Sequence, residues 1–195
     1  MRARRRTLSL QEREQYARRA AAHLCRSPLF RRSRRIACYL AQDGEMDSAP
    51  LMARAWAMGK TIYLPVLHAM PAGRLRFAPY HPGAALRYNR FDIPEPDVPL
   101  RQMVRAQDLD LVLTPLVAFD AAGNRLGMGK AFYDRCLAFL HRRRHWLRPR
   151  VVGFAYGFQE VAQLTPRPWD IPLNAVVTES GLRELGSWPL PRDMR

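Results

Sequence analysis

The sequence predicts an α/β fold with three layers, α/β/α, around a largely parallel central sheet. Short apolar runs typical of buried strands alternate along the chain with amphipathic segments typical of helices. In the N-terminal half, the order strand, helix, strand favours parallel pairing through a right-handed crossover. A length of 195 residues, 48% of them hydrophobic, suffices for one domain with a sizeable core. We expect a single domain over residues 1–180 and a C-terminal tail over 181–195.

The first third of the chain contains two predicted helices, each followed by a predicted strand. A helix over 9–26 begins with a capping-box pattern and ends before a proline. The apolar run 36–40 is typical of a core strand. A second helix over 47–59 has a proline in its first turn and ends at a glycine, and the run 61–64 predicts the next strand.

The remainder of the chain is less regular until its last core strands. Alternating apolar residues over 75–80 predict a strand that is polar on one side, in an antiparallel appendage. Prolines concentrate in long loops over 81–99, and loops of this length are usually functional or mobile. Further core strands are predicted at 111–114, 151–156 and 174–178.

The net charge of +15 comes almost wholly from arginine, since only Lys60 and Lys130 are lysines among the 32 basic residues. Such a charge attracts anionic partners, whether nucleotides, small polyanions or nucleic acid. Arginine runs at 2–6, 31–35 and 142–144 could form a patch for a phosphate backbone, but three solvated helix ends or faces are the favoured interpretation.

Composition also indicates the cellular compartment. Three scattered cysteines without a CxxC pair are typical of reduced thiols. The longest apolar runs are too short for a membrane helix, and no secretory signal follows the N-terminal arginines. We therefore expect a cytoplasmic protein that does not associate with membranes.

The segment 111–137 combines a buried strand, a glycine-bearing loop and a helix N-terminus. Gly127 and Gly129 allow the backbone to approach a ligand, and the helix N-terminus offers unpaired N–H groups to a phosphate. Arg125 and Lys130 add positive charge on either side of this loop. A lone GxG pattern has low specificity, and a purely structural turn is the alternative interpretation.

Two aspartates are candidate Mg²⁺ ligands, because Mg²⁺ takes one or two carboxylates and completes its shell with water and phosphate. Asp134 follows Lys130 by one helical turn, so an i, i+4 ion pair is the alternative. Asp170 lies between prolines, where a turn aspartate is the alternative.

These motifs resemble the 5-formyltetrahydrofolate cyclo-ligase family. The resemblance is carried by PLVAFDAAGNRLGMGKAFYDR at 115–135, by YLAQDGEMD at 39–47 and by WDIPLNAVVT at 169–178, and it extends from Arg6 to Thr178. The family uses ATP to close 5-formyltetrahydrofolate into 5,10-methenyltetrahydrofolate, with release of ADP and phosphate. The resemblance therefore implies an ATP- and Mg²⁺-dependent ligase whose partners are a folate and ATP.

The resemblance also implies roles for particular residues. Arg125 and Lys130 would be catalytic, and Asp134 and Asp170 would hold Mg²⁺. The folate would be bound by Leu40, Glu45, Met128 and Tyr133. The ATP phosphates would be bound by Arg125, Leu126, Gly127, Met128, Gly129, Lys130, Ala131, Phe132 and Tyr133.

Two further expectations concern activity. Many relatives carry glycine where this chain has Ala131, and at a positive φ an alanine would cost about 1 kcal/mol. The alternative function is a basic protein associated with nucleic acid that keeps the fold and has lost catalysis; the ordered set of motifs favours the enzyme.

Overall fold

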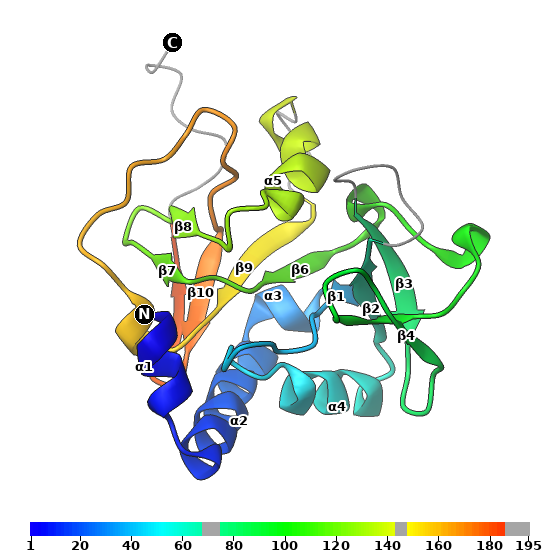
Figure 1. The fold of residues 1–195 in the computed structure, drawn as a ribbon, viewed down its shortest axis with the longest axis horizontal. Helices are drawn as coiled ribbons and strands as arrows, with labels where there is room; N and C mark the ends of the chain where they lie inside the picture. The colour runs from blue at the N-terminus through cyan, green and yellow to red at the C-terminus, as the bar shows by residue number, and fades with distance from the viewer. Residues whose placement is uncertain (68–74, 143–147, 186–195) are drawn as a thin grey trace.

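The computed structural model describes residues 1–67, 75–142 and 148–185. Its centre is a seven-stranded sheet with the order β11-β10-β9-β6-β1-β2-β3 (Figure 1). The five inner strands pair in parallel, and the two edge strands, β3 and β11, pair antiparallel. The predicted α/β fold with a largely parallel sheet is confirmed. The sheet consists of β1 (Arg35–Ala37), β2 (Thr61–Val66), β3 (Arg76–Tyr80), β6 (Leu111–Thr114), β9 (Arg150–Phe154), β10 (Ala175–Thr178) and β11 (Gly181–Glu184).

The helices follow the predicted positions closely in the N-terminal half. Helix α2 (Leu10–Arg26) begins at a complete capping box, in which the Ser9 Oγ accepts from the Glu12 N–H and the Glu12 carboxylate accepts from the Ser9 N–H. Helix α4 (Ala49–Ala57) lies within the second predicted helix. The shorter helices are α1 (Arg2–Thr7), α3 (Pro28–Arg31) and α5 (Phe132–Leu137), and the 3-10 turns are η1 (Leu100–Gln102), η2 (Ala106–Asp108), η3 (Ala138–Arg142) and η4 (Gly157–Gln159).

Side chains of alternate strand residues fill two separate cores, one on each face of the sheet. Ile36 of β1 packs in the core under α2 and α4, and Ala37, its neighbour, packs in the core under α5 and η3. Leu111 and Val112 of β6 divide in the same way. Because strand side chains alternate between faces, these short apolar runs are buried on both sides. This arrangement gives the predicted three layers.

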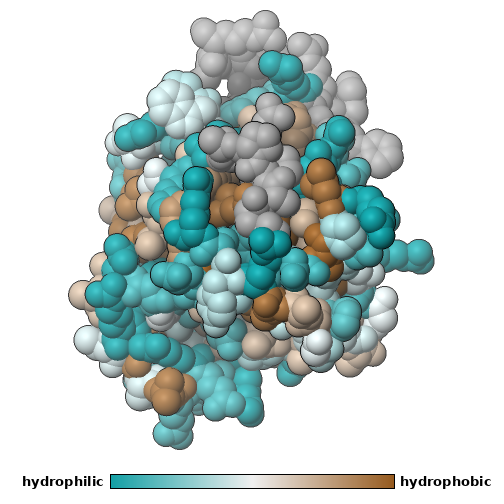
Figure 2. All heavy atoms as spheres, turned by 45° about the vertical axis from the view of Figure 1, so that its right-hand side comes forward, coloured by the Kyte–Doolittle hydropathy of each residue, from teal (hydrophilic) through white to brown (hydrophobic). Residues whose placement is uncertain are grey.

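Two small hairpins lie outside the main sheet: β4 (Leu86–Tyr88) pairs with β5 (Pro94–Pro96), and β7 (Ala118–Phe119) pairs with β8 (Arg125–Leu126). The β4–β5 hairpin occupies part of the predicted loop region 81–99. Figure 2 turns toward the side of the molecule that carries it, where hydrophilic residues predominate and hydrophobic residues form small groups. None of the helices in the described parts of the chain is long and apolar enough to cross a membrane.

The prediction of a C-terminal tail from residue 181 is wrong in its first part. Residues 181–184 form the edge strand β11, with Val176 of β10 opposite Arg183, and Leu185 is buried. The sequence GLRE carries little apolar alternation, so its strand structure depends on pairing with β10. The rest of the expected tail, 186–195, lies outside the described residues.

Candidate active site

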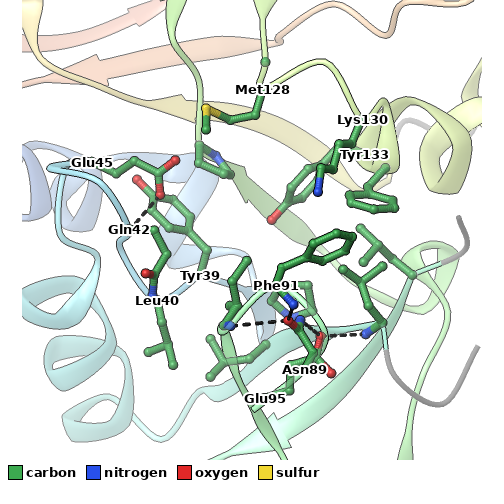
Figure 3. Close-up of a pocket in the computed structure, with 18 of the residues that line it drawn as sticks. Tyr39, Leu40, Gln42, Glu45, Asn89, Phe91, Glu95, Met128, Lys130 and Tyr133 are labelled. Carbon is green, nitrogen blue, oxygen red and sulfur yellow. Dashed lines mark hydrogen bonds between the residues drawn. The ribbon is translucent and has the colours of Figure 1, made fainter. Parts of the chain in front are cut away.

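A pocket of about 390 Å³ lies at the carboxyl ends of β1, β2 and β6, where ligands bind in sheets of this kind (Figure 3). The turn after β1, the β4–β5 hairpin and the segment 125–134 contribute its walls. Of the described residues, Leu126, Gly129 and Asp170 are predicted site residues that do not line it. The predicted site residues that the pocket brings together are Leu40, Glu45, Arg125, Gly127, Met128, Lys130, Ala131, Phe132, Tyr133 and Asp134.

The glycine-bearing loop adopts the backbone conformations that its residues suggested. Gly129 has φ +83°, and a Cβ at Gly127 or Gly129 would meet nothing within 4 Å, so the space beside both residues is open. Ala131 has φ 47° and ψ 29° as the N-cap residue of α5. The expectation that this alanine would be strained is correct, because the left-handed region costs an alanine roughly 1–2 kcal/mol.

Arg125 and Asp134 form a buried ion pair in the wall of the pocket. The Arg125 Nη2 donates to the Asp134 Oδ1 over 2.6 Å, and the two side chains are only 6% and 10% exposed. The same oxygen accepts from the Ile171 N–H over 3.1 Å. The Arg125 Nε is buried and has no hydrogen-bond partner among the described residues. The alternative pairing of Asp134 with Lys130 is therefore wrong, and Arg125 retains a donor for a further acceptor.

Lys130 lies over an aromatic ring that sequence reasoning did not select. Its Nζ is 3.2 Å from the centroid of the Phe91 ring, and the Phe91 and Phe132 rings are 6.2 Å apart. Phe91 lies in the turn of the β4–β5 hairpin, and only the fold brings this turn to the glycine-bearing loop. No local signal marks Phe91, apart from its place in a long proline-rich segment.

Glu45 supplies a carboxylate to the opposite side of the pocket. Burial raises the pKa of Glu45, while the Gln42 N–H, which donates to its Oε2 over 3.1 Å, and the charge of Arg5 act in the opposite direction. Burial also raises the pKa of Tyr133, so this phenol stays neutral. Figure 3 shows Glu45, Met128 and Tyr133 around the same hollow.

The two predicted metal ligands lie on neighbouring segments. Asp170 immediately precedes Ile171, whose N–H bonds to Asp134, and the Asp170 Oδ2 accepts from the Arg167 N–H over 2.8 Å. In the part of the chain that the structure describes, no three His, Cys, Asp or Glu side chains form a metal-binding group. A Mg²⁺ ion with one or two carboxylates, water and phosphate oxygens fits this donor set.

The first arginine run is only partly free to contact an anionic partner. Arg5 is completely buried, and its Nη1 donates to the Leu116 carbonyl over 3.2 Å. Arg2 and Arg6 both pair with Asp43, whose pKa they lower to about 2. Nucleic-acid binding therefore loses part of its proposed surface and stays an untested alternative.

The comparisons with known proteins decide the family. A family model described as the 5-formyltetrahydrofolate cyclo-ligase family matches residues 1–179. The chain belongs to this family. It is 42% identical to the 5-formyltetrahydrofolate cyclo-ligase of Escherichia coli, across 94% of this chain and 99% of that one, and 40% identical to the one of Haemophilus influenzae across 73% and 74%.

Solved structures agree with the family assignment. The chain superposes on a 5,10-methenyltetrahydrofolate synthetase of Aquifex aeolicus with a TM-score of 0.78 and 32% identity, covering 100% of this chain and 94% of that one. A second synthetase, from Mycoplasma pneumoniae, is 19% identical with a TM-score of 0.69, covers 91% and 93%, and supports the fold alone. The predicted family is confirmed, and with it the prediction of a folate cyclo-ligase enzyme. The roles of single residues stay predictions.

Proposed function

We propose that this member of the family closes 5-formyltetrahydrofolate to 5,10-methenyltetrahydrofolate with ATP and Mg²⁺, and releases ADP and phosphate. The observation that carries the proposal is Arg125, which lines the pocket with a side chain that is only 6% exposed and whose Nε has no hydrogen-bond partner among the described residues. An arginine in this state is suited to a phosphate oxygen. We take a cytoplasmic location as part of the same proposal.

The phosphate side of the site consists of Arg125, Lys130 and the backbone of 126–133. Arg125 is held in place by Asp134, so it offers a positive charge in a fixed direction. Lys130 is exposed and needs only to exchange its contact with Phe91 for a phosphate oxygen. Such phosphoryl transfer depends mainly on positioning and on neutralising oxygen charge.

The folate side of the site is mainly apolar with a few polar groups, as is typical of small-molecule pockets. Leu40, Met128 and Tyr133 offer apolar surface to a flat ring, and Glu45 offers a hydrogen-bond acceptor to ring N–H groups. A cavity of about 390 Å³ accommodates the ring system of the folate, whose tail would leave toward solvent.

The reaction needs no nucleophile from the protein. In the proposed chemistry the γ-phosphoryl group passes to the formyl oxygen. N10 of the folate then attacks the activated carbon and loses its proton to water or to the departing phosphate, and the C–O bond breaks as phosphate leaves with that oxygen. Cys136 of α5 does not line the pocket, and burial raises the pKa of its thiol to about 12, so this thiol is protonated near neutral pH. The chain's contribution is therefore positioning and charge.

Asp134 and Asp170 would hold the Mg²⁺ ion. The ion would neutralise charge on the phosphate oxygens when bound. Because Asp134 already accepts from Arg125 and Ile171 through Oδ1, we expect its second oxygen to serve as the ligand atom. Asp170 is the cleaner residue to test, since its described contact is a backbone N–H of its own turn.

The test is a turnover assay that follows the near-ultraviolet absorbance of the methenyl product. We expect an absorbance rise that needs ATP and that disappears when a chelator removes Mg²⁺. Asp170→Asn should raise the Mg²⁺ concentration needed for half-maximal rate while the folate KM at saturating Mg²⁺ stays close to its original value. A folded protein without ATP-dependent turnover would contradict the proposal, and an unchanged Mg²⁺ titration would remove Asp170 as a ligand.

A further inference from the structure

A second carboxylate, Glu95 on β5, lies on the hairpin side of the pocket and has none of the predicted roles. It lines the pocket but is only 1% exposed. Its Oε1 accepts from the Leu67 N–H over 2.8 Å and from the Asn89 Nδ2 over 2.5 Å (Figure 3). Since this oxygen is taken up by two donors of the protein, it acts between chain segments and not as an open acceptor for substrate.

Asn89 extends this contact into the turn of the hairpin. Its Oδ1 accepts from the N–H groups of Phe91 and Ile93 over 2.8 and 3.3 Å. The Asn89 backbone also bonds to Ile93 and to Asp92, which has φ 55°. An asparagine that bonds its own backbone two residues ahead defines the shape of a turn. The conformation of 89–93 therefore depends on one side chain that Glu95 orients.

The turn places Phe91 at the pocket, beside Lys130 of the glycine-bearing loop. The centroid of the Phe91 ring lies 3.2 Å from the Lys130 Nζ and 6.2 Å from the centroid of the Phe132 ring. Any shift of the turn changes the width of the pocket between the hairpin and the glycine-bearing loop. A continuous series of contacts thus runs from Leu67 through Glu95 and Asn89 to this pocket wall.

The hairpin benefits from such an anchor, because within residues 1–67, 75–142 and 148–185 strand β4 pairs with β5 alone, in a two-stranded sheet. Two-stranded hairpins are marginally stable by themselves. Leu67 directly follows β2 of the main sheet, so the bond from its N–H to Glu95 ties the hairpin to the end of a central element. Bonds to an ionised carboxylate are stronger than those between neutral groups.

We propose that Glu95 is a positioning residue for the folate side of the active site: with Asn89 it fixes the Phe91 turn, and the fixed turn sets the affinity for the folate ring. The proposal rests on the proposed function for the identity of the ligand. It concerns the wall of the pocket. Lys130 contacts the Phe91 ring but would exchange this contact for a phosphate oxygen when ATP binds, so phosphate binding does not depend on the turn.

The kinetic test compares two Glu95 variants with a control on the same hairpin. Glu95→Ala removes the acceptor, and the KM for 5-formyltetrahydrofolate should rise at least about tenfold, since small displacements in a site have effects of this order. The KM for ATP should change less than about threefold, because the phosphate groups keep their places. Glu95→Gln keeps an acceptor oxygen and should restore the folate KM to within about threefold of the original.

Asp97→Asn is the matched control. Asp97 pairs with Arg87 across the same hairpin, but both side chains are 52% exposed, so its loss should leave both KM values unchanged. A purely structural role for Glu95 would lower the folded fraction and the apparent kcat, whereas KM would stay constant. A folate KM for Glu95→Ala within twofold of the original (about 0.4 kcal/mol) would overturn the proposal.

Hydrogen exchange over residues 86–96 tests the same proposal without turnover. Exchange at the Phe91 and Ile93 amides should accelerate in Glu95→Ala and in Asn89→Ala, but not in Asp97→Asn. If Glu95→Ala does not fold, Asn89→Ala serves in both experiments, because it keeps the bond between Glu95 and Leu67. If the unaltered protein shows no turnover, the proposed function fails, and the exchange result alone decides whether Glu95 holds the turn. Equal exchange in all variants would show that it does not.

Discussion

Arg125 and Arg5 are both buried arginines with side-chain nitrogen atoms that have no hydrogen-bond partner among the described residues, but their surroundings give them different roles. Arg125 lines the pocket and pairs with the buried Asp134. Arg5 does not line the pocket, and its Nη2 lies 3.6 Å from a carboxylate oxygen of Asp43, whose side chain is 21% exposed. Asp43 also pairs with Arg2 and Arg6. Burial alone therefore does not identify a ligand-binding arginine. Two further features do: access to the cavity, and an acidic partner that pairs with no other described arginine.

The largest expected effect comes from Arg125→Ala. Asp134 would remain buried without its ion-pair partner, so the free energy of unfolding should fall by about 3–5 kcal/mol, as for other broken buried pairs. Turnover should be lost as well. Urea unfolding and the absorbance assay measure both. Arg125→Lys is the control: the retained charge should recover much of the stability but little turnover, because lysine lacks the two-pronged geometry of arginine. Full turnover in either variant would contradict the assigned role.

Lys130→Ala should lower turnover strongly while it changes the stability of the protein very little. The side chain is exposed, so the free energy of unfolding should change by no more than about 1 kcal/mol, the value of an exposed cation–π contact. The kcat should fall about 100-fold if Lys130 stabilises the transferring phosphoryl group. Arg90→Ala is the matched control, since the Arg90 guanidinium carbon lies 5.0 Å from the centroid of the same Phe91 ring but Arg90 does not line the pocket. Equal kcat values for the two variants would argue against a catalytic Lys130.

Arg5→Met should shift the pH dependence of kcat/KM. It should destabilise the protein less than Arg125→Ala does, because Asp43 keeps its ion pairs with Arg2 and Arg6. Burial raises the pKa of Glu45, and Arg5 opposes that rise. Removing Arg5 should raise the pKa of Glu45 further. If ionised Glu45 binds the folate ring, the acid limb of kcat/KM shifts to higher pH in this variant.

Several groups besides Arg5 face Glu45, so control variants are needed to assign the pH shift to the charge of Arg5. These groups are the Gln42 N–H, the charges of Asp43 and Arg2, and the phenols of Tyr39 and Tyr133. Arg5→Lys keeps the positive charge and should keep the original limb. Glu45→Gln should lack the limb altogether. An unshifted profile in Arg5→Met would mean that Arg5 only supports the structure.

The smallest expected effect is a gain in stability from Ala131→Gly. Glycine relieves the left-handed strain at this position but loses more chain entropy on folding, so the net gain should be about 0.5–1 kcal/mol. Ala138, at the end of α5, has an ordinary φ of −53°, and Ala138→Gly should destabilise instead, by up to about 1 kcal/mol. Chemical denaturation of the two variants checks the opposite signs. A loss of stability in Ala131→Gly would show that the strain is compensated elsewhere.

Much of the fold could be predicted because its signals are local. The capping box at Ser9 starts α2 where expected, and the apolar runs at 36–40 and 111–114 contain β1 and β6. The alternating pattern over 75–80 correctly predicted an antiparallel strand, β3, although it belongs to the main sheet. Strand β11 was missed because its four residues carry no comparable pattern.

The sequence alone was enough to assign the family, the α/β class and one contiguous part of the pocket lining, the segment 125–134, since neighbouring residues share a loop and a helix start in any fold. The tertiary structure alone decided which distant groups meet there. It paired Asp134 with Arg125 in place of Lys130, buried Arg5 within an apparent surface run, and brought Phe91 and Glu95 to the pocket. The physical reason is that burial and pairing depend on elements far apart in the chain, and no local pattern records the distance between them.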